Sequence, residues 1–295
     1  MVKTPTQDHA KTSVQLTHPE RIYWPDDGVS KQDLVDYYAL AWTRMAPFVV
    51  DRPLALLRCP DGIGGPRFFQ KHAWKGINPH IEEIADPEDR NGEKYLRIRD
   101  FDGLAALVQS AALEIHPWGT TTAHWERPDM IIMDLDPGED VGWDAVIEAA
   151  QDIRRRFSAM GLASYVKTSG GKGLHVVAPL KPKAEWPEVK KAAEAIAEGM
   201  SADDPHRYLS VATKAKRPGH IFVDYLRNGR GNTAVAPYST RARPGAAISM
   251  PLAWEELTEK IGPASFTVRN AASRLKPGAA DPWADFFEAA QPLKG

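Results

Sequence analysis

Residues 130–138 read MIIMDLDPG, an apolar run that ends in two aspartates and a Pro-Gly turn. The run predicts a buried β-strand that stops at the turn. Asp134 and Asp136 are two residues apart, so the period of two along a strand sends both side chains to one face. Two carboxylates in one small volume repel each other unless a cation offsets them, and paired oxygen ligands are what Mg²⁺ or Mn²⁺ binds. For this segment alone, a metal site and a simple turn cap both stay open.

A third carboxylate would complete a metal site, and Asp224 is the leading candidate. It lies in the apolar stretch IFVDY at residues 221–225, and it is the only acid between residues 207 and 243. The basic residues of this segment are Arg207, Lys214, Lys216, Arg217, Arg227, Arg230, Arg241 and Arg243. The whole chain has a net charge of -2, but this local excess of positive charge indicates a polyanion-binding surface.

A glycine-rich loop with the sequence TSGGKGLH occupies residues 168–175, between two predicted strands. The glycines allow successive backbone N–H groups to converge on an anion, and Ser169, Lys172 and His175 can add side-chain donors. The loop therefore predicts a triphosphate cradle, although its spacing is not that of a Walker A motif. An ordinary hairpin turn that binds nothing is the alternative.

Aromatic, imidazole and guanidinium groups elsewhere supply further candidate contacts. Phe68 and Phe69 are adjacent, so on a strand one can enter the core while the other faces a cleft in which a base could stack. Two core aromatics are the alternative. His116 could contact a sugar or a phosphate, although a lone histidine is more often structural. Arg241 and Arg243 flank one alanine, so in an extended segment both could bind one phosphate, unless they are scattered surface charges.

The order of the elements predicts an α/β (α+β) fold with mixed β-sheets flanked by helices. A capping box that begins at Ser30 starts a helix predicted to end at Pro47. Residues 103–113 predict a second helix, and residues 233–236 predict a late strand of the sheet. Residues 1–15 are polar and aperiodic, which predicts a flexible N-terminal arm.

Composition limits the class of protein. The 295 residues are 43% apolar and 26% charged, which is typical of a globular enzyme. A single cysteine, Cys59, excludes an internal disulfide and a zinc cage of several thiolates, and a reducing cytoplasm is the expected compartment. There is no apolar run near 18 residues and no apolar segment at the start, so we expect neither export nor membrane insertion.

With these motifs assembled, about residues 16–260 resemble the polymerase domain of bacterial DNA ligase D and its stand-alone relatives in the archaeo-eukaryotic primase superfamily. The matching stretches, in chain order, are LTHPERIYWP with Lys31, RFFQKHAWKG, EIHPWG, MDLDPG, TSGGKGLHVVAPL and FVDYLRNGRGNTAVAPYSTRARPGA. The resemblance implies a primase-polymerase fold with an RRM-like catalytic core at about residues 100–260, within a single domain of residues 16–295. Because no Lys-x-Asp-Gly ligase motif occurs, we expect a polymerase-only chain, either free-standing or an excised domain.

The resemblance also implies roles for individual residues. Asp134, Asp136 and Asp224 would bind two divalent ions, Mn²⁺ or Mg²⁺, that join a primer 3′-hydroxyl to the α-phosphate of an incoming NTP or dNTP. The implied nucleotide contacts are Ser169, Lys172, His175, Arg217, Arg241 and Arg243 around the phosphates, Phe68 or Phe69 at the base or template, and His116 near the sugar.

A DNA contact is implied near the amino end. Arg21 and Lys31 match positions that recognise a 5′-phosphate at a DNA gap, break or overhang, and His18 stands where some relatives have Asn. The implied function is template-dependent gap filling in non-homologous end joining, often with ribonucleotides preferred. Ku and a DNA ligase are the expected partners, and a nucleoid-associated cytoplasmic protein with no membrane contact is the expected setting.

Other classes of protein fit the motifs less well. Phosphatases with a nucleophilic first aspartate usually have Thr or Val after the second, whereas Pro137 follows here. A glycosyltransferase with an Asp-x-Asp motif would not explain the basic segment. A non-catalytic module that binds DNA ends is the third alternative, and the presence of all three aspartates argues against it.

Overall fold

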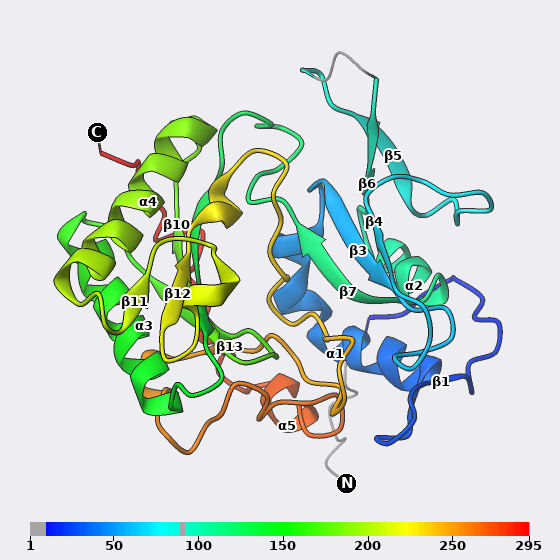
Figure 1. The fold of residues 1–295 in the computed structure, drawn as a ribbon. Helices are drawn as coiled ribbons and strands as arrows, with labels where there is room; N and C mark the ends of the chain where they lie inside the picture. The colour runs from blue at the N-terminus through cyan, green and yellow to red at the C-terminus, as the bar shows by residue number, and fades with distance from the viewer. Residues whose placement is uncertain (1–9, 89–91, 295) are drawn as a thin grey trace, which may run out of the picture.

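Two β-sheets from different halves of the chain lie side by side, with most of the helices on their outer surfaces (Figure 1). The computed structural model describes residues 10–88 and 92–294. Among these residues, no helix is both long and apolar enough to span a bilayer. Residues 1–9 of the expected N-terminal arm lie outside the described part of the chain.

The second half of the chain builds a six-stranded sheet in the order β11-β12-β8-β10-β9-β13. Its strands are β8 (Met130–Pro137), β9 (Tyr165–Thr168), β10 (Leu174–Pro179), β11 (Tyr208–Leu209), β12 (Ile221–Asp224) and β13 (Pro251–Leu252). Its helices, which pack on the outer face of the sheet, are α3 (Trp143–Ala159) and α4 (Trp186–Asp203).

The connections of this sheet identify its type. Apart from the short edge strand β11, the elements run β8-α3-β9-β10-α4-β12 along the chain, and β12, β8, β10 and β9 are successive antiparallel neighbours. This is the split β-α-β-β-α-β arrangement, in which the strand order is fourth, first, third, second. The expected mixed α+β class and the RRM-like core are therefore confirmed.

The first half of the chain builds a five-stranded sheet. Its strands are β3 (Leu54–Arg58), β4 (Phe68–Gln70), β5 (Glu82–Ala85), β6 (Lys94–Arg97) and β7 (Ala112–Pro117), with β7 paired to β3. The remaining elements are the paired β1 (Ile22–Trp24) and β2 (Val29–Ser30), the helices α1 (Lys31–Val49), α2 (Phe101–Gln109) and α5 (Ala272–Leu275), and the 3₁₀ turns η1 (Lys214–Lys216), η2 (Leu226–Asn228) and η3 (Trp254–Glu256).

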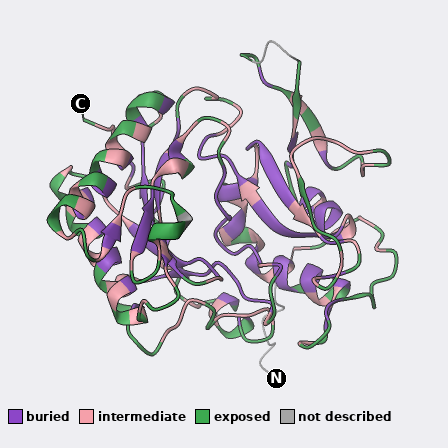
Figure 2. Ribbon diagram, viewed as in Figure 1, coloured by how far each residue is buried: buried purple, intermediate pink, exposed green. Residues whose placement is uncertain are grey.

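Period-two burial along β8 separates the core from the site. Ile131, Met133 and Leu135 are fully buried and belong to the same apolar cluster as the inner residues of α3 and α4. The alternate residues of the strand, which include Asp134 and Asp136, must then lie on the opposite face. Figure 2 shows the burial concentrated in the two sheets and on the inner sides of their helices.

The capping box is confirmed, and helix α1 continues past its expected end. The Ser30 hydroxyl oxygen accepts the Asp33 backbone N–H at 3.1 Å, and the Asp33 carboxylate accepts both the Ser30 backbone N–H and the Ser30 hydroxyl at 2.8 Å. Helix α1 runs through Pro47 to Val49. A proline this close to the C-terminus removes one hydrogen bond of a helix that is already ending, so the last turn tolerates it.

Three expectations about local structure were wrong. The helix predicted over residues 103–113 ends at Gln109, and Ala112 begins β7, because Ala111 adopts φ +61° and breaks the helical path. Residues 233–236 contain no strand, and Thr233 makes only a single bridge, to Trp118.

Residues 10–15 are not a free arm, which corrects the third expectation. The Asp102 carboxylate, in the first turn of α2, accepts the Thr12 hydroxyl at 2.7 Å and the Ser13 backbone N–H at 2.8 Å. Val14 packs against the core cluster. The partial positive charge at a helix N-terminus stabilises a carboxylate there. In this protein the Asp102 carboxylate also holds residues 12 and 13 against α2.

Candidate active site

A row of four polar side chains crosses the face of the six-stranded sheet that α3 and α4 leave free. Asp224 on β12 is opposite Asp134 on β8, Asp134 is opposite His175 on β10, and His175 is opposite Lys167 on β9. Directly opposed residues of antiparallel strands have their side chains about 5 Å apart. Asp136 follows on the same face of β8. Strand register therefore brings together groups from four separate segments of sequence.

Asp134 lies at the centre of this row and is surrounded by basic groups. Its carboxylate is 3.3 Å from His175 Nε2 and 3.4 Å from Arg227 Nε, which is also 3.2 Å from the Asp224 carboxylate. Burial alone would raise the pKa of Asp134, but His175, Arg227 and Lys167 lower it below its ordinary value. Asp134 is therefore ionised at neutral pH.

The three aspartates offer the oxygen ligands that suit a divalent ion. Burial raises the pKa of Asp224, and Asp134 and Asp136 raise it too, although Arg227 lowers it. A carboxylate disfavoured in this way gains from a nearby cation. As the side chains stand, no three His, Cys, Asp or Glu residues within the described ranges are grouped closely enough to hold an ion. The chemistry of the donor set fits a divalent ion, while Arg227 and Arg217 now form ion pairs with these carboxylates.

Arg217 and Lys172 were both expected beside phosphate. Arg217 lies in the connection between η1 and β12, where it forms an ion pair with Asp136 and its guanidinium lies 4.7 Å from the centre of the Phe222 ring. Arg217 therefore pairs with a carboxylate in place of the expected phosphate. A guanidinium can form paired hydrogen bonds with either group. Lys172 is exposed at the rim of the cleft described below.

The glycine-rich loop is the hairpin turn between β9 and β10. Ser169 Oγ accepts the backbone N–H groups of Gly171 and Gly173 at 3.2 and 3.1 Å, which holds the loop in a tight curve. Gly170 has φ +63°, and a Cβ there would lie 2.7 Å from Arg241 Cγ, so no other residue fits. Because Ser169 Oγ accepts in both bonds, its hydroxyl proton remains available for donation.

The loop and the aspartates border one cleft of about 340 Å³, which is large enough for a nucleotide-sized ligand. The expected site residues that line it are Asp134, Asp136, Ser169, Lys172, His175, Arg241 and Arg243. One wall is thus acidic and the other is rich in donors for anions. This asymmetry suits a ligand that carries phosphates and reacts next to a metal-binding centre.

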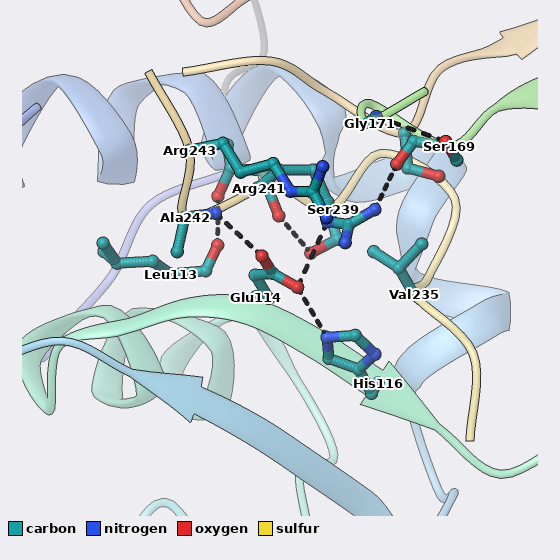
Figure 3. A network of polar contacts seen from close by, with 12 residues as sticks. Leu113, Glu114, His116, Ser169, Gly171, Val235, Ser239, Arg241, Ala242 and Arg243 are labelled. Atoms are coloured by element: carbon teal, nitrogen blue, oxygen red, sulfur yellow. Dashed lines mark hydrogen bonds and ion pairs between the residues drawn. The ribbon is translucent and has the colours of Figure 1, made fainter. Parts of the chain in front are cut away.

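A buried network, shown in Figure 3, connects His116 to this cleft. His116 Nε2 is 2.8 Å from Glu114 Oε2, and Arg241 Nε is 3.1 Å from the same oxygen. Arg241 also donates from Nη1 to the Ser169 carbonyl at 2.5 Å. Burial lowers the pKa of His116 although Glu114 raises it, so the imidazole is neutral at pH 7. His116 lines a cavity of about 70 Å³ that also contacts Asp134.

The sequence left open whether one or both of Phe68 and Phe69 enter the core, and the structure shows neither arrangement. They lie on β4, an edge strand of the five-stranded sheet, and their exposed fractions are 51% and 55%. Neither ring enters the core. The Phe69 ring meets the His116 ring edge to face, with 5.6 Å between their centres. Phe69 is therefore the aromatic residue adjacent to the candidate site.

Arg21 and Lys31 come close together at the start of α1, but Lys31 is not a surface cation. Its side chain is buried, and Nζ donates to the Thr17 carbonyl at 2.6 Å and to Gln109 Oε1 at 3.2 Å. Burial and the charge of Arg21 lower the pKa of Lys31. Arg21 is exposed and donates to the Pro60 carbonyl at 3.0 Å.

His18 lies on the surface beside these residues. Its backbone has φ +51°, and its ring Nδ1 is 3.3 Å from Glu20. Asparagine is among the residues that enter this left-handed region most easily, so the position favours a short polar side chain. The structure brings His18 near Arg21 without placing it in the cleft.

Sequence reasoning missed three residues of the site. Arg227 follows Asp224 at a spacing of three, and Glu114 precedes His116 at the spacing that places both on one face of a strand. These two signals were available. Lys167, which is fully buried and donates to the Val235 carbonyl and the Ser249 hydroxyl, carried no local signal, because its partners are more than 60 residues away in sequence.

Comparisons with known proteins identify the family of this chain. Residues 30–283 match the family model described as the primase-polymerase domain of LigD. The multifunctional non-homologous end joining protein LigD of Pseudomonas aeruginosa is 39% identical over 278 residues, which cover 94% of this chain and 33% of that protein. The corresponding Mycobacterium tuberculosis protein is 31% identical over 254 residues, which cover 83% and 34%. The chain thus spans about a third of the length of these relatives.

A solved structure gives the same result. The polymerase domain of M. tuberculosis ligase D, determined in complex with DNA, matches with a TM-score of 0.86 and 27% sequence identity, covering 95% of this chain and 100% of that one. Family, sequence and fold therefore coincide over almost the whole chain. The chain belongs to the LigD primase-polymerase family, a family of DNA-directed nucleotidyltransferases.

Proposed function

We propose that this protein is a template-dependent polymerase that extends a primer 3′-hydroxyl at DNA breaks or gaps during non-homologous end joining. The observation that carries the proposal is the cleft in which Asp134, Asp136 and a loop rich in phosphate donors face each other, with Asp224 directly opposite Asp134. The names of the P. aeruginosa and M. tuberculosis relatives support the repair setting.

Asp134, Asp136 and Asp224 would hold two divalent ions, Mn²⁺ or Mg²⁺. When bound, such ions lower the pKa of the attacking hydroxyl and offset the charge that develops on the α-phosphate. Arg227 and Arg217 now neutralise these carboxylates, so both guanidinium groups would leave them as the substrates bind. Once displaced, each would be free to pair with phosphate.

The triphosphate would lie against the glycine-rich loop. Ser169 and Lys172 would donate from the loop, and Arg241 and Arg243 from the facing segment, with His175 between the phosphates and Asp134. Phe69, and Phe68 beside it, would stack on the base or the template. His116 would contact the sugar, from where a preference for ribonucleotides could arise.

DNA would bind over the basic segment of residues 207–243, and Arg21, Lys31 and His18 would recognise a downstream 5′-phosphate. The neighbouring M. tuberculosis domain was solved with DNA, which supports a DNA partner. Lys31 would need to release Thr17 or Gln109 to reach a phosphate, whereas Arg21 is already exposed. Ku and a DNA ligase, in a cytoplasmic nucleoid setting, would be the partners of such an enzyme.

The test is primer extension on a gapped duplex that carries a 5′-phosphate, with NTPs or dNTPs and with Mn²⁺ or Mg²⁺. We expect templated addition that stops at the gap and weakens when the 5′-phosphate is replaced by a hydroxyl. Asp136→Asn, which removes one ion-binding charge and keeps the side-chain shape, is the matched inactive control. Absence of templated addition with every nucleotide and both metals would overturn the proposal.

A further inference from the structure

Glu114 is a buried carboxylate behind the cleft that touches neither the aspartates nor the glycine-rich loop. It lies on β7, and its side chain is 5% exposed. Three groups converge on it: His116 Nε2 is 2.8 Å from Oε2, the Ala242 backbone N–H donates to Oε1 at 2.9 Å, and Arg241 forms an ion pair with Oε2 at 3.1 Å (Figure 3). Burying a charged carboxylate is costly unless its oxygens are satisfied in this way.

The charge of Glu114 determines where the proton of His116 lies. Burial would raise the pKa of Glu114, but His116, Arg241 and the Ala242 N–H lower it to about 2, so at pH 7 the group only accepts hydrogen bonds. His116 Nε2 must therefore carry the proton. Because the ring is neutral, Nδ1 is left with a lone pair, and it has no hydrogen-bond partner among the described residues.

The free nitrogen is in the right place to accept from a ligand. Nδ1 points away from Glu114 in Figure 3, and the ring lines the cavity of about 70 Å³ next to Asp134 and His175. A lone pair there selects a group that donates, and a sugar hydroxyl is such a group. If Nδ1 were protonated instead, the same position would repel that hydroxyl proton.

The other side of Glu114 fixes the phosphate donor. Its Oε2 forms an ion pair with the Arg241 guanidinium, and Arg241 Nη1 donates to the Ser169 carbonyl in the glycine-rich loop. A guanidinium fixed at two points keeps its remaining N–H groups in a set direction, toward the cleft it lines. One carboxylate therefore connects His116 to the loop through Arg241.

We propose that Glu114 is a positioning residue that prepares two nucleotide contacts at once: it keeps Nδ1 of His116 as an acceptor for a sugar hydroxyl, and it holds Arg241 toward the phosphates. This inference rests on the proposed function. Glu114 itself contacts no substrate. Only a carboxylate suffices, because a glutamine in its place has one acceptor oxygen and turns an N–H toward at least one of the three donors.

A purely structural role is the competing explanation, since Glu114 also ties β7 to the segment of residues 239–243. Thr240 provides a matched control for this. Its hydroxyl donates to the Leu113 carbonyl at 2.6 Å and also meets the Tyr38 hydroxyl at 3.1 Å, so it connects the same two segments through bonds to neither the His116 nor the Arg241 side chain. Thr240→Val should therefore reproduce any loss of structural support and none of the change in nucleotide recognition.

The experiment compares wild type, Glu114→Gln, His116→Ala, the double variant and Thr240→Val. Single-nucleotide addition is measured with ATP, 2′-deoxy-ATP and 3′-deoxy-ATP, and calorimetry gives the Kd of each nucleotide in the absence of DNA. In wild type we expect one of the two deoxy analogues to bind about tenfold more weakly than ATP. Glu114→Gln and His116→Ala should both abolish that difference in Kd, and Glu114→Gln should also weaken the binding of ATP itself.

The double variant tests whether Glu114 acts through His116. Its discrimination between ATP and the deoxy analogue should equal that of His116→Ala alone. If Glu114 acts through His116, the free-energy effects of the two substitutions on this discrimination do not add. The inference is overturned if Glu114→Gln keeps the wild-type discrimination, or if Thr240→Val loses it to the same extent. If wild type binds nucleotides but adds none, the proposed function fails while the binding comparison still decides the role of Glu114.

Discussion

The two sheets of this protein present their candidate site residues in opposite ways. In the six-stranded sheet the row from Asp224 to Lys167 is set by strand register and is largely buried, and each member lies directly opposite its neighbour on the next strand. In the five-stranded sheet, Phe68 and Phe69 lie on the edge strand β4 with more than half of each side chain exposed.

The difference separates chemistry from recognition. A side chain fixed by register and burial keeps its geometry before any ligand arrives, which is what positioning a reacting group requires. An exposed ring on an edge strand can adjust to whatever base it meets, and stacking tolerates such variation. Substitutions in the six-stranded sheet should therefore abolish the reaction or change the pKa values of neighbouring groups. Substitutions of the exposed rings in the five-stranded sheet should weaken ligand binding and leave the fold intact.

The largest effect is expected for Asp134→Ala. Loss of a central metal ligand removes several kcal/mol of transition-state stabilisation, which is roughly a thousandfold in the rate of nucleotide addition. Quenched-flow or gel-based primer extension measures the rate, and DNA affinity should stay near that of wild type. Asp152→Ala is the control, because this acid lies on α3, on the far side of the same sheet, where it pairs with Arg155 and Arg156. Near-normal extension by Asp134→Ala would remove Asp134 from the chemistry.

The next effect concerns Glu114 and stability. Its pKa is about 2 in the folded protein against an ordinary value of 4.5, and this depression corresponds to roughly 3 kcal/mol of folding free energy. Because the folded pKa is depressed, this stability is fully present above about pH 4.5 and is lost as pH falls toward about 2. Wild type should therefore exceed Glu114→Gln in unfolding free energy at pH 7, and the gap should narrow below pH 4.5.

Urea unfolding at several pH values measures this gap. Glu148→Gln is the control, since Glu148 is an exposed acid of α3 that pairs with Arg207 on the surface, where an ion pair contributes little. A gap for Glu114→Gln that stays constant down to pH 3 would show that the carboxylate is not held as the structure indicates.

Phe69 should show the opposite pattern. Phe69→Ala is expected to weaken nucleotide or template binding by about 1–3 kcal/mol through lost stacking, with little change in the melting temperature because the ring is exposed. Phe68→Ala should weaken binding less, since Phe69 is the ring of this pair that meets the His116 ring edge to face. Phe69→Trp should retain binding, because it keeps a stacking surface. Equal effects of the two alanine variants would mean that β4 is placed differently when ligand is bound.

The sequence predicted the six-stranded sheet better than the five-stranded sheet for a physical reason. An apolar run such as residues 130–136, closed by Pro-Gly, has one good structural solution, and period two then fixes the face of each aspartate. The stretch around Ala111 is different. Its apolar residues continue without Gly or Pro from a helix into a strand, so composition gave no sign of the break that the positive φ of Ala111 produces.

The candidate site was predictable in its residues more than in its contacts. Asp134, Ser169 and Arg241 were found because their residue types and local spacing carry chemistry. Which cation would meet which carboxylate depends on register between β8 and β12, and no local pattern encodes that register. The burial of Lys31 was missed for the same reason, because its partner Gln109 lies on another helix.

The smallest effect is expected at the predicted 5′-phosphate site, where the same distinction between held and exposed side chains applies within one pair. Arg21 is exposed, so Arg21→Ala should leave the melting temperature unchanged and flatten the salt dependence of binding to a 5′-phosphorylated gap by about one unit of slope. Lys31→Ala should instead lower stability by about 1–3 kcal/mol, because the Thr17 carbonyl and Gln109 lose a buried donor.

Fluorescence anisotropy over a range of salt concentrations separates the two roles of this pair. On a duplex that ends in a 5′-hydroxyl, wild type and Arg21→Ala should have equal slopes, because the contact that Arg21 supplies is absent from both. Arg99→Ala is the control, since Arg99 is a similarly exposed arginine that is already paired with Glu82. If Arg21→Ala flattened the slope equally on both duplexes, Arg21 would bind the DNA backbone in general, and recognition of the phosphate would have to come from elsewhere on the basic surface.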